Sequence, residues 1–85
     1  MTIKDYAMLA AKSLLDKKAD DVLVIDIQGK APFADYFVIC SGNSERQVAS
    51  LADEVEDKLA ENGLLVKSIE GKQGSGWILM DFGDI

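Results

Sequence analysis

The sequence predicts a single α/β domain, residues 1–85, in which two helices pack on one mixed β-sheet in the order αββαββ. Two segments show the three- and four-residue spacing of apolar side chains that is typical of a helix. Four shorter segments are rich in β-branched and aromatic residues, and turn residues separate them. The chain is 48% hydrophobic and 28% charged, which is the composition of a folded domain rather than of a disordered segment.

The two helices are predicted at 2–17 and 45–62. Thr2 and Ser44 precede them as N-caps, and Asp5 lies three residues after Thr2, as in a capping box. The second helix has the clearer pattern. Its apolar face consists of Val48, Leu51, Ala52, Val55 and Leu59.

The strands are predicted at 22–27, 36–40, 64–69 and 77–82. The first two are apolar on both faces, which is typical of strands that are covered on both sides. Two helices are too few to cover both faces of a four-stranded sheet, so we expect both helices on one face. The other face is then open to solvent, to a second copy of the chain or to a partner.

The last strand carries the most informative pattern. Alternation places Trp77, Leu79 and Asp81 on one face, and Asp26 and Asp35 are expected to join that face and its rim. The opposite face is wholly apolar and suits the core: it consists of Ile78, Met80 and Phe82. An exposed aromatic beside an aliphatic and a carboxylate is typical of an interface. In the alternative, Trp77 folds over the sheet edge and Asp81 caps a turn, and the residues leave both interpretations open.

The chain is poorly equipped for catalysis. It has no His, which is the commonest metal ligand and general base, and its single Cys40 lies within an apolar strand. Asp81 and Asp84 are the only candidates for a Mg²⁺ site, and the turn at Ser41-Gly42 is better explained by an N-cap than by an anion site. We therefore expect no enzyme activity, no catalytic residues, no cofactor and no metal.

Charge and hydropathy exclude two classes of partner. The net charge of −6 argues against binding to a nucleic-acid backbone, which requires clustered Lys and Arg. The apolar segments are strand-sized, well below the roughly 20 residues that a membrane span needs. The expected location is therefore the cytoplasm.

Taken together, these segments resemble the ribosomal silencing factor family (RsfS, also called iojap), over essentially the whole chain. The stretch 34–44 reads Ala-Asp-Tyr-Phe-Val-Ile-x-Ser-Gly-x-Ser, and the stretch 77–84 reads Trp-x-x-x-Asp-x-Gly-Asp. The combination of these two motifs, with a helix between them, is specific. Further matching positions are 26–30, Arg46, Val48, Ala52, Asp53, Gly63, Leu64, Glu70 and Gly71.

The resemblance implies a nucleotidyltransferase-like topology without the catalytic residues of those enzymes, and a homodimer when the chain is free. It implies a protein that binds the large ribosomal subunit through ribosomal protein fourteen, blocks association with the small subunit and represses translation during starvation or stationary phase. Members continue past the Gly-Asp turn with a further strand and helix, so this chain is expected to be C-terminally short.

The resemblance also marks Trp77, Asp81 and their neighbours as the partner-binding strip. The residues that we assign to it are Trp77, Leu79, Asp81, Asp84, Glu70, Asp35 and Asp26. Two other functions remain as alternatives. One is a nucleotide- and metal-binding, nucleotidyltransferase-like enzyme that uses Asp81, Asp84 and the Ser41-Gly42 turn. The other is a dimer module whose open sheet face pairs only with itself.

Overall fold

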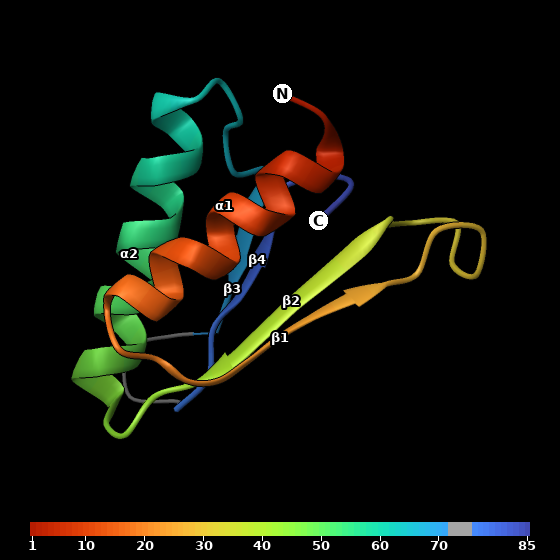
Figure 1. The fold of residues 1–85 in the computed structure, drawn as a ribbon. Helices are drawn as coiled ribbons and strands as arrows, with labels where there is room; N and C mark the ends of the chain where they lie inside the picture. The colour runs from red at the N-terminus through yellow and green to blue at the C-terminus, as the bar shows by residue number, and fades with distance from the viewer. Residues whose placement is uncertain (72–75) are drawn as a thin grey trace.

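The computed structural model describes residues 1–71 and 76–85, and it has the predicted order of two helices and four strands (Figure 1). The elements are α1 (Ile3–Asp16), β1 (Asp20–Asp26), β2 (Tyr36–Ser41), α2 (Glu45–Glu61), β3 (Ser68–Glu70) and β4 (Leu79–Asp81). The α/β class is confirmed, and both helices lie within a residue of their predicted bounds. The last two strands are shorter than predicted.

A capping box begins α1, as the sequence predicts. The side-chain oxygen of Thr2 accepts from Asp5 N at 3.1 Å, and Asp5 Oδ2 accepts from Thr2 N at 2.9 Å. The hydrogen bond from Thr2 N is also the main reason why the pKa of the Asp5 carboxyl is lowered from its ordinary value. Each partner thereby satisfies one of the backbone N–H groups that a helix leaves unpaired at its start.

This capping box predicts a loss of stability in acid. Because the pKa of Asp5 is lower in the folded chain, Asp5 stabilises the fold above its ordinary pKa, and that contribution is lost as the pH falls through the lowered pKa. In Asp5→Asn we expect a smaller fall of Tm over the same acidic range, measured by circular dichroism. Asp57→Asn, at an exposed position on α2, is the matched control and should retain the acid dependence of the parent chain. Identical profiles for Asp5→Asn and the parent would contradict the assignment.

The second helix, α2, contributes three large aliphatic side chains to the core. Ser44 is its N-cap and accepts from Gln47 N at 3.1 Å. Its buried side chains, Leu51, Val55 and Leu59, follow the predicted four-residue spacing. They pack against Ala10 and Leu14 of α1 and against Phe82, which follows β4.

The strands form two separate antiparallel sheets, and the prediction of one mixed sheet is wrong for the described residues. β1 pairs with β2, β3 pairs with β4, and no hydrogen-bonded ladder joins the two pairs within the described ranges. Leu64 and Val66, which were expected to open the third strand, pack against the core before pairing begins at Ser68. Because the sheets are separate, the nucleotidyltransferase-like topology stays a prediction.

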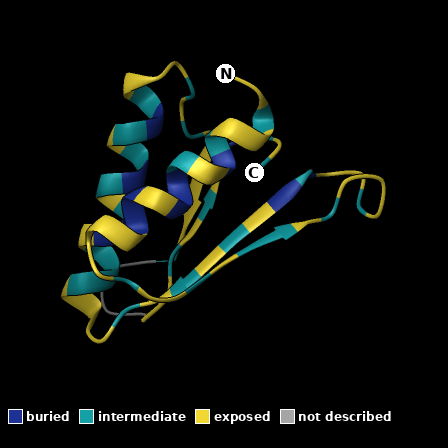
Figure 2. Cartoon of the chain, in the orientation of Figure 1, coloured by how far each residue is buried: buried dark blue, intermediate teal, exposed yellow. Residues whose placement is uncertain are grey.

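Both helices lie on the same side of the strands, and no helix of residues 1–71 and 76–85 lies on the opposite side. In β2, Tyr36 is buried and Val38 and Cys40 pack against the core, whereas Phe37 and Ile39 point away and are exposed. Figure 2 shows that burial is concentrated along the facing sides of α1 and α2 and at the start of β2. No helix in the described part of the chain is long and apolar enough to span a bilayer.

Candidate partner-binding surface

Burial along β4 follows the alternation that the sequence predicts. Trp77 and Leu79 are each 55% exposed and Asp81 is exposed, whereas Phe82 is only 4% exposed. Met80 packs against the core from the same side as Phe82. The segment 77–81 therefore presents an indole, a leucine and a carboxylate on the side that faces away from the core.

Trp77 combines exposure with a close contact to Gly71. Gly71 has a φ of +91°, and a Cβ atom placed on it would lie 2.3 Å from the carbonyl oxygen of Trp77 and 3.0 Å from Cε3 of the indole. Only a glycine allows this approach without displacing the tryptophan. The ring of Trp77 therefore lies over Gly71 beside the β3–β4 pair, while more than half of its surface faces solvent. Its role as a partner contact stays a prediction.

Two carboxylates share the outer face of the β3–β4 pair. Glu70 lies opposite Leu79 in the ladder, and Ser68 lies opposite Asp81, so Glu70 and Asp81 flank Leu79 on one face. Asp81 Oδ1 also accepts from Gly83 N at 2.8 Å, which orients this carboxylate at the turn. The predicted turn-capping role of Asp81 is therefore present together with its place on the exposed strip.

Asp84 and Asp35 lie together at one end of the strands. The carbonyl oxygen of Asp84 accepts from Asp35 N at 2.8 Å and from Tyr36 N at 3.2 Å, which joins the last turn of the chain to the start of β2. Asp84 is exposed and Asp35 is half-buried. The backbone contact places these two acidic residues next to each other at the start of β2, and the rim position predicted for Asp35 stays a prediction.

Asp26 does not lie on this surface, and the expectation that it joins the Trp77 face is wrong. The ladder places Asp26 opposite Tyr36, whose side chain is buried on the helix side. Directly opposed residues of an antiparallel pair point to the same face. Asp26 instead begins a turn, because its Oδ1 accepts from Gln28 N at 2.9 Å.

The apolar outer face of the β1–β2 pair is a feature that we had not assigned to the site. Leu23 is 53% exposed and Ile39, its ladder partner, is 48% exposed. Phe37 is also exposed, and its ring stacks on Phe33 at a centroid distance of 6.1 Å. The signal was present in the sequence as strands that are apolar on both faces, which we had taken as a sign of double coverage. We call the combined surface the helix-free face: its residues are Leu23, Phe33, Phe37, Ile39, Glu70, Trp77, Leu79 and Asp81.

Two of the features that were considered for catalysis, the 41–44 turn and Cys40, lie against α2 and the core. Gly42 lies so close to Val48 that a Cβ on it would meet Val48 Cγ2 at 2.9 Å, and Ser44 caps α2, so the 41–44 turn starts the helix. Residues 1–71 and 76–85 contain no group of three or more His, Cys, Asp or Glu side chains that would hold a metal ion. Burial raises the pKa of the Cys40 thiol, which disfavours the reactive thiolate.

Comparison with known proteins places these features in a family. The model of a family described as "Ribosomal silencing factor during starvation" matches residues 1–85. A ribosomal silencing factor from Bacillus subtilis is 44% identical over 85 residues, which is all of this chain and 72% of the relative. One from Halalkalibacterium halodurans is 38% identical over the same 85 residues and 73% of its length.

Solved structures agree with this comparison. A crystal structure of a protein from Chromobacterium violaceum superposes with a TM-score of 0.93 at 33% identity, covering 99% of this chain and 70% of that one. A crystal structure from Bacillus halodurans superposes with a TM-score of 0.85 at 37% identity, covering 95% of this chain and 75% of that one. This chain therefore has the same fold as these proteins over the aligned residues.

Proposed function

Because this chain belongs to the ribosomal silencing factor family, we propose that it binds the ribosome and represses translation without catalysing a reaction. The partner is the large subunit, bound through ribosomal protein fourteen, and the bound chain sterically prevents the small subunit from joining. The chain represses translation during starvation or stationary phase, and it acts in the cytoplasm. The free chain forms homodimers.

The helix-free face is the observation that carries this proposal. Trp77 and Leu79 are each more than half exposed and lie beside the carboxylates of Glu70 and Asp81. Exposed aromatic side chains within an apolar patch are typical anchors of protein interfaces. A rim of carboxylates suits a basic partner such as a ribosomal protein.

The charge of the chain supports the same partner. A net charge of −6 attracts a basic surface from a distance, which raises the association rate more than it lowers the dissociation rate. On the ribosome, the bulk of the chain is then sufficient to obstruct subunit joining, and no reacting group is required.

Trp77→Ala tests the proposal. We expect the substitution to weaken binding to purified large subunits by on the order of 2 kcal/mol, about thirtyfold, because it removes the aromatic anchor. The measurement is co-sedimentation of the chain with large subunits, together with light scattering to follow subunit joining.

Leu65→Ala is the matched control, because Leu65 is 71% exposed and lies outside the helix-free face. It should bind and block as the parent chain does. A Trp77→Ala chain that keeps its circular dichroism spectrum and binds large subunits with the parent affinity would refute the role of this surface.

A further inference from the structure

A row of basic and apolar side chains runs along the outer side of α1. We call it the α1 row, and its residues are Lys4, Met8, Lys12 and Leu15. They follow one another at steps of four, four and three residues, which places them in one line on the surface of a helix. Met8 is 52% exposed and Leu15 is 59% exposed, and both lysines are exposed as well. The row therefore alternates a cation with an apolar group along about three turns of helix.

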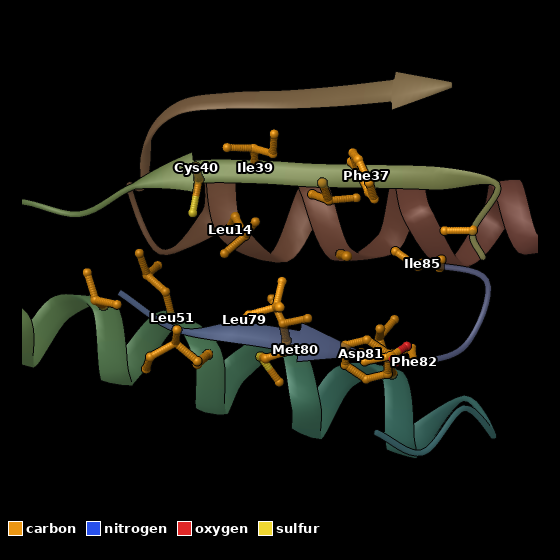
Figure 3. Close-up of a pocket in the computed structure, with 18 of the residues that line it drawn as sticks. Leu14, Phe37, Ile39, Cys40, Leu51, Leu79, Met80, Asp81, Phe82 and Ile85 are labelled. Carbon is orange, nitrogen blue, oxygen red and sulfur yellow. The ribbon is translucent and has the colours of Figure 1, made fainter. Parts of the chain in front are cut away.

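The α1 row faces away from the core. Figure 3 shows Leu14 pointing from α1 into the interior space that it shares with Leu51 of α2. The row lies on the other side of α1, where exposed positions recur along the helix (Figure 2). Because the helices lie on one side of the strands and the helix-free face lies on the other, the two surfaces are on opposite sides of the molecule. A partner on the α1 row therefore does not compete with a partner on the helix-free face.

The charge of α1 is opposite to that of the chain. Residues 3–18 contain four Lys and two Asp and carry +2, whereas the remaining residues carry −8. One of these two acids, Asp5, is held at the start of the helix, because its Oδ2 accepts from Thr2 N. Within residues 1–71 and 76–85, neither Lys4 nor Lys12 takes part in an ion pair. The cations of the row are therefore available to carboxylates of another molecule.

The spacing of the apolar residues fits a helical partner. Met8 and Leu15 are seven residues apart, which is about 10.5 Å along a helix axis. A second helix that lies along α1 repeats its contacts at the same seven-residue interval. A strand repeats a face about every 6.6–6.8 Å, so its side chains do not stay aligned with both positions. Methionine also adapts readily to the shape of an incoming side chain.

We propose that the α1 row binds an acidic amphipathic helix of another protein. Apolar side chains of that helix, seven residues apart, contact Met8 and Leu15, and its Asp or Glu side chains pair with Lys4 and Lys12. The contact surface is small, as in weak and reversible complexes. An RNA backbone suits the row less well, because it offers phosphates to the lysines but leaves the two apolar side chains without apolar partners.

A labelled peptide tests this proposal without ribosomes. The probe is a fluorescent helical peptide of about three heptads, with leucine at every seventh position, glutamate beside each leucine and alanine elsewhere. We expect saturable binding to the 85-residue chain by anisotropy. The binding should weaken as the salt concentration rises from about 0.1 M to about 1 M. The same peptide with lysine in place of glutamate should bind at least about tenfold more weakly, because like charges then meet.

Matched variants locate the binding site. The double variant Met8→Gln/Leu15→Gln removes the apolar contacts, keeps the charge and retains good helix formers, and it should bind the peptide at least about tenfold more weakly. Leu65→Gln, at a position that is 71% exposed and outside α1, should bind as the parent chain does. Lys12→Glu should also weaken binding at least about tenfold. Lys30→Glu makes the same change of charge at an exposed position outside α1 and should weaken binding by less than about threefold.

Binding to large ribosomal subunits separates this proposal from the proposed function. The double variant Met8→Gln/Leu15→Gln should bind large subunits as the parent chain does, because the helix-free face is unchanged. Circular dichroism shows whether each variant keeps its fold.

Four results would overturn the proposal. One is the absence of saturable binding by the acidic peptide. A second is equal weakening by Lys12→Glu and Lys30→Glu, which would show a response to net charge rather than to the α1 row. A third is tighter binding of an RNA duplex than of the peptide, lost in Lys12→Glu. The fourth is self-association of the chain in sedimentation that Met8→Gln/Leu15→Gln abolishes, which would show that a second copy occupies the row.

Discussion

Replacing Leu59 with alanine is expected to lower the free energy of unfolding by about 3 kcal/mol. Leu59 has no exposed surface and lies among the buried side chains of α1, α2 and Phe82. The substitution removes buried methyl groups and leaves a cavity among side chains of α1, α2 and Phe82, which the surrounding structure closes only partly. In so short a chain, this is a large part of a total stability of about 5–15 kcal/mol.

Urea unfolding followed by circular dichroism measures this loss. Leu65→Ala removes the same atoms from a side chain that is 71% exposed, and we expect its free energy of unfolding to change by less than about 0.5 kcal/mol. Equal unfolding midpoints for Leu59→Ala and Leu65→Ala would contradict the view that the helix contact is the centre of the core.

The helices were predictable because their signals are local. The spacing of Leu51, Val55 and Leu59 identifies the buried face of α2 without any knowledge of what packs on it, and these side chains are buried as predicted. Thr2 and Ser44 are likewise recognisable as N-caps from the residues that follow them. Each of these features depends on residues within about one turn of helix.

The sheet was less predictable because pairing depends on distant parts of the chain. The segments of the strands were identified, but the sequence does not indicate that the β1–β2 pair and the β3–β4 pair form separate sheets in the described residues. The 64–69 segment also shows that the start of strand pairing cannot be predicted from local sequence. Its apolar Leu64 and Val66 are used for packing, and ladder pairing begins only at Ser68.

The candidate site, too, was predictable only where the signal in the sequence is local. Alternation alone places Leu79 and Asp81 on one face of β4, and this prediction agrees with the observed burial. The face to which Asp26 belongs was assigned wrongly, because β1 is apolar on both sides and its sequence does not tell which side the helices cover. The contact between Gly71 and Trp77 joins residues six positions apart in the sequence, and no motif in the sequence predicts it.

The contact between Gly71 and Trp77 is the basis of a second substitution with a large expected effect on stability. We expect Gly71→Ala to lower the free energy of unfolding by about 3 kcal/mol, the sum of a positive φ and a clash. At a φ of +91°, the new Cβ would lie 2.3 Å from the carbonyl oxygen of Trp77, so the backbone beside β4 must move. The indole moves with it, and the fluorescence of Trp77, the single tryptophan of the chain, should shift.

Gly29→Ala separates the two causes. Gly29 has a φ of +76° and nothing within 4 Å of its Cβ position, so alanine there meets the backbone cost without the clash. We expect Gly29→Ala to lower the free energy of unfolding by about 1–2 kcal/mol and to keep the tryptophan fluorescence spectrum of the parent chain. We expect Gly71→Ala to lower the free energy of unfolding by more than Gly29→Ala does. We also expect Gly71→Ala to bind large ribosomal subunits more weakly, because Trp77 is displaced. If both variants lose the same stability and Gly71→Ala keeps the parent spectrum, the glycine does not position Trp77, and the shape of the helix-free face must be set by other contacts.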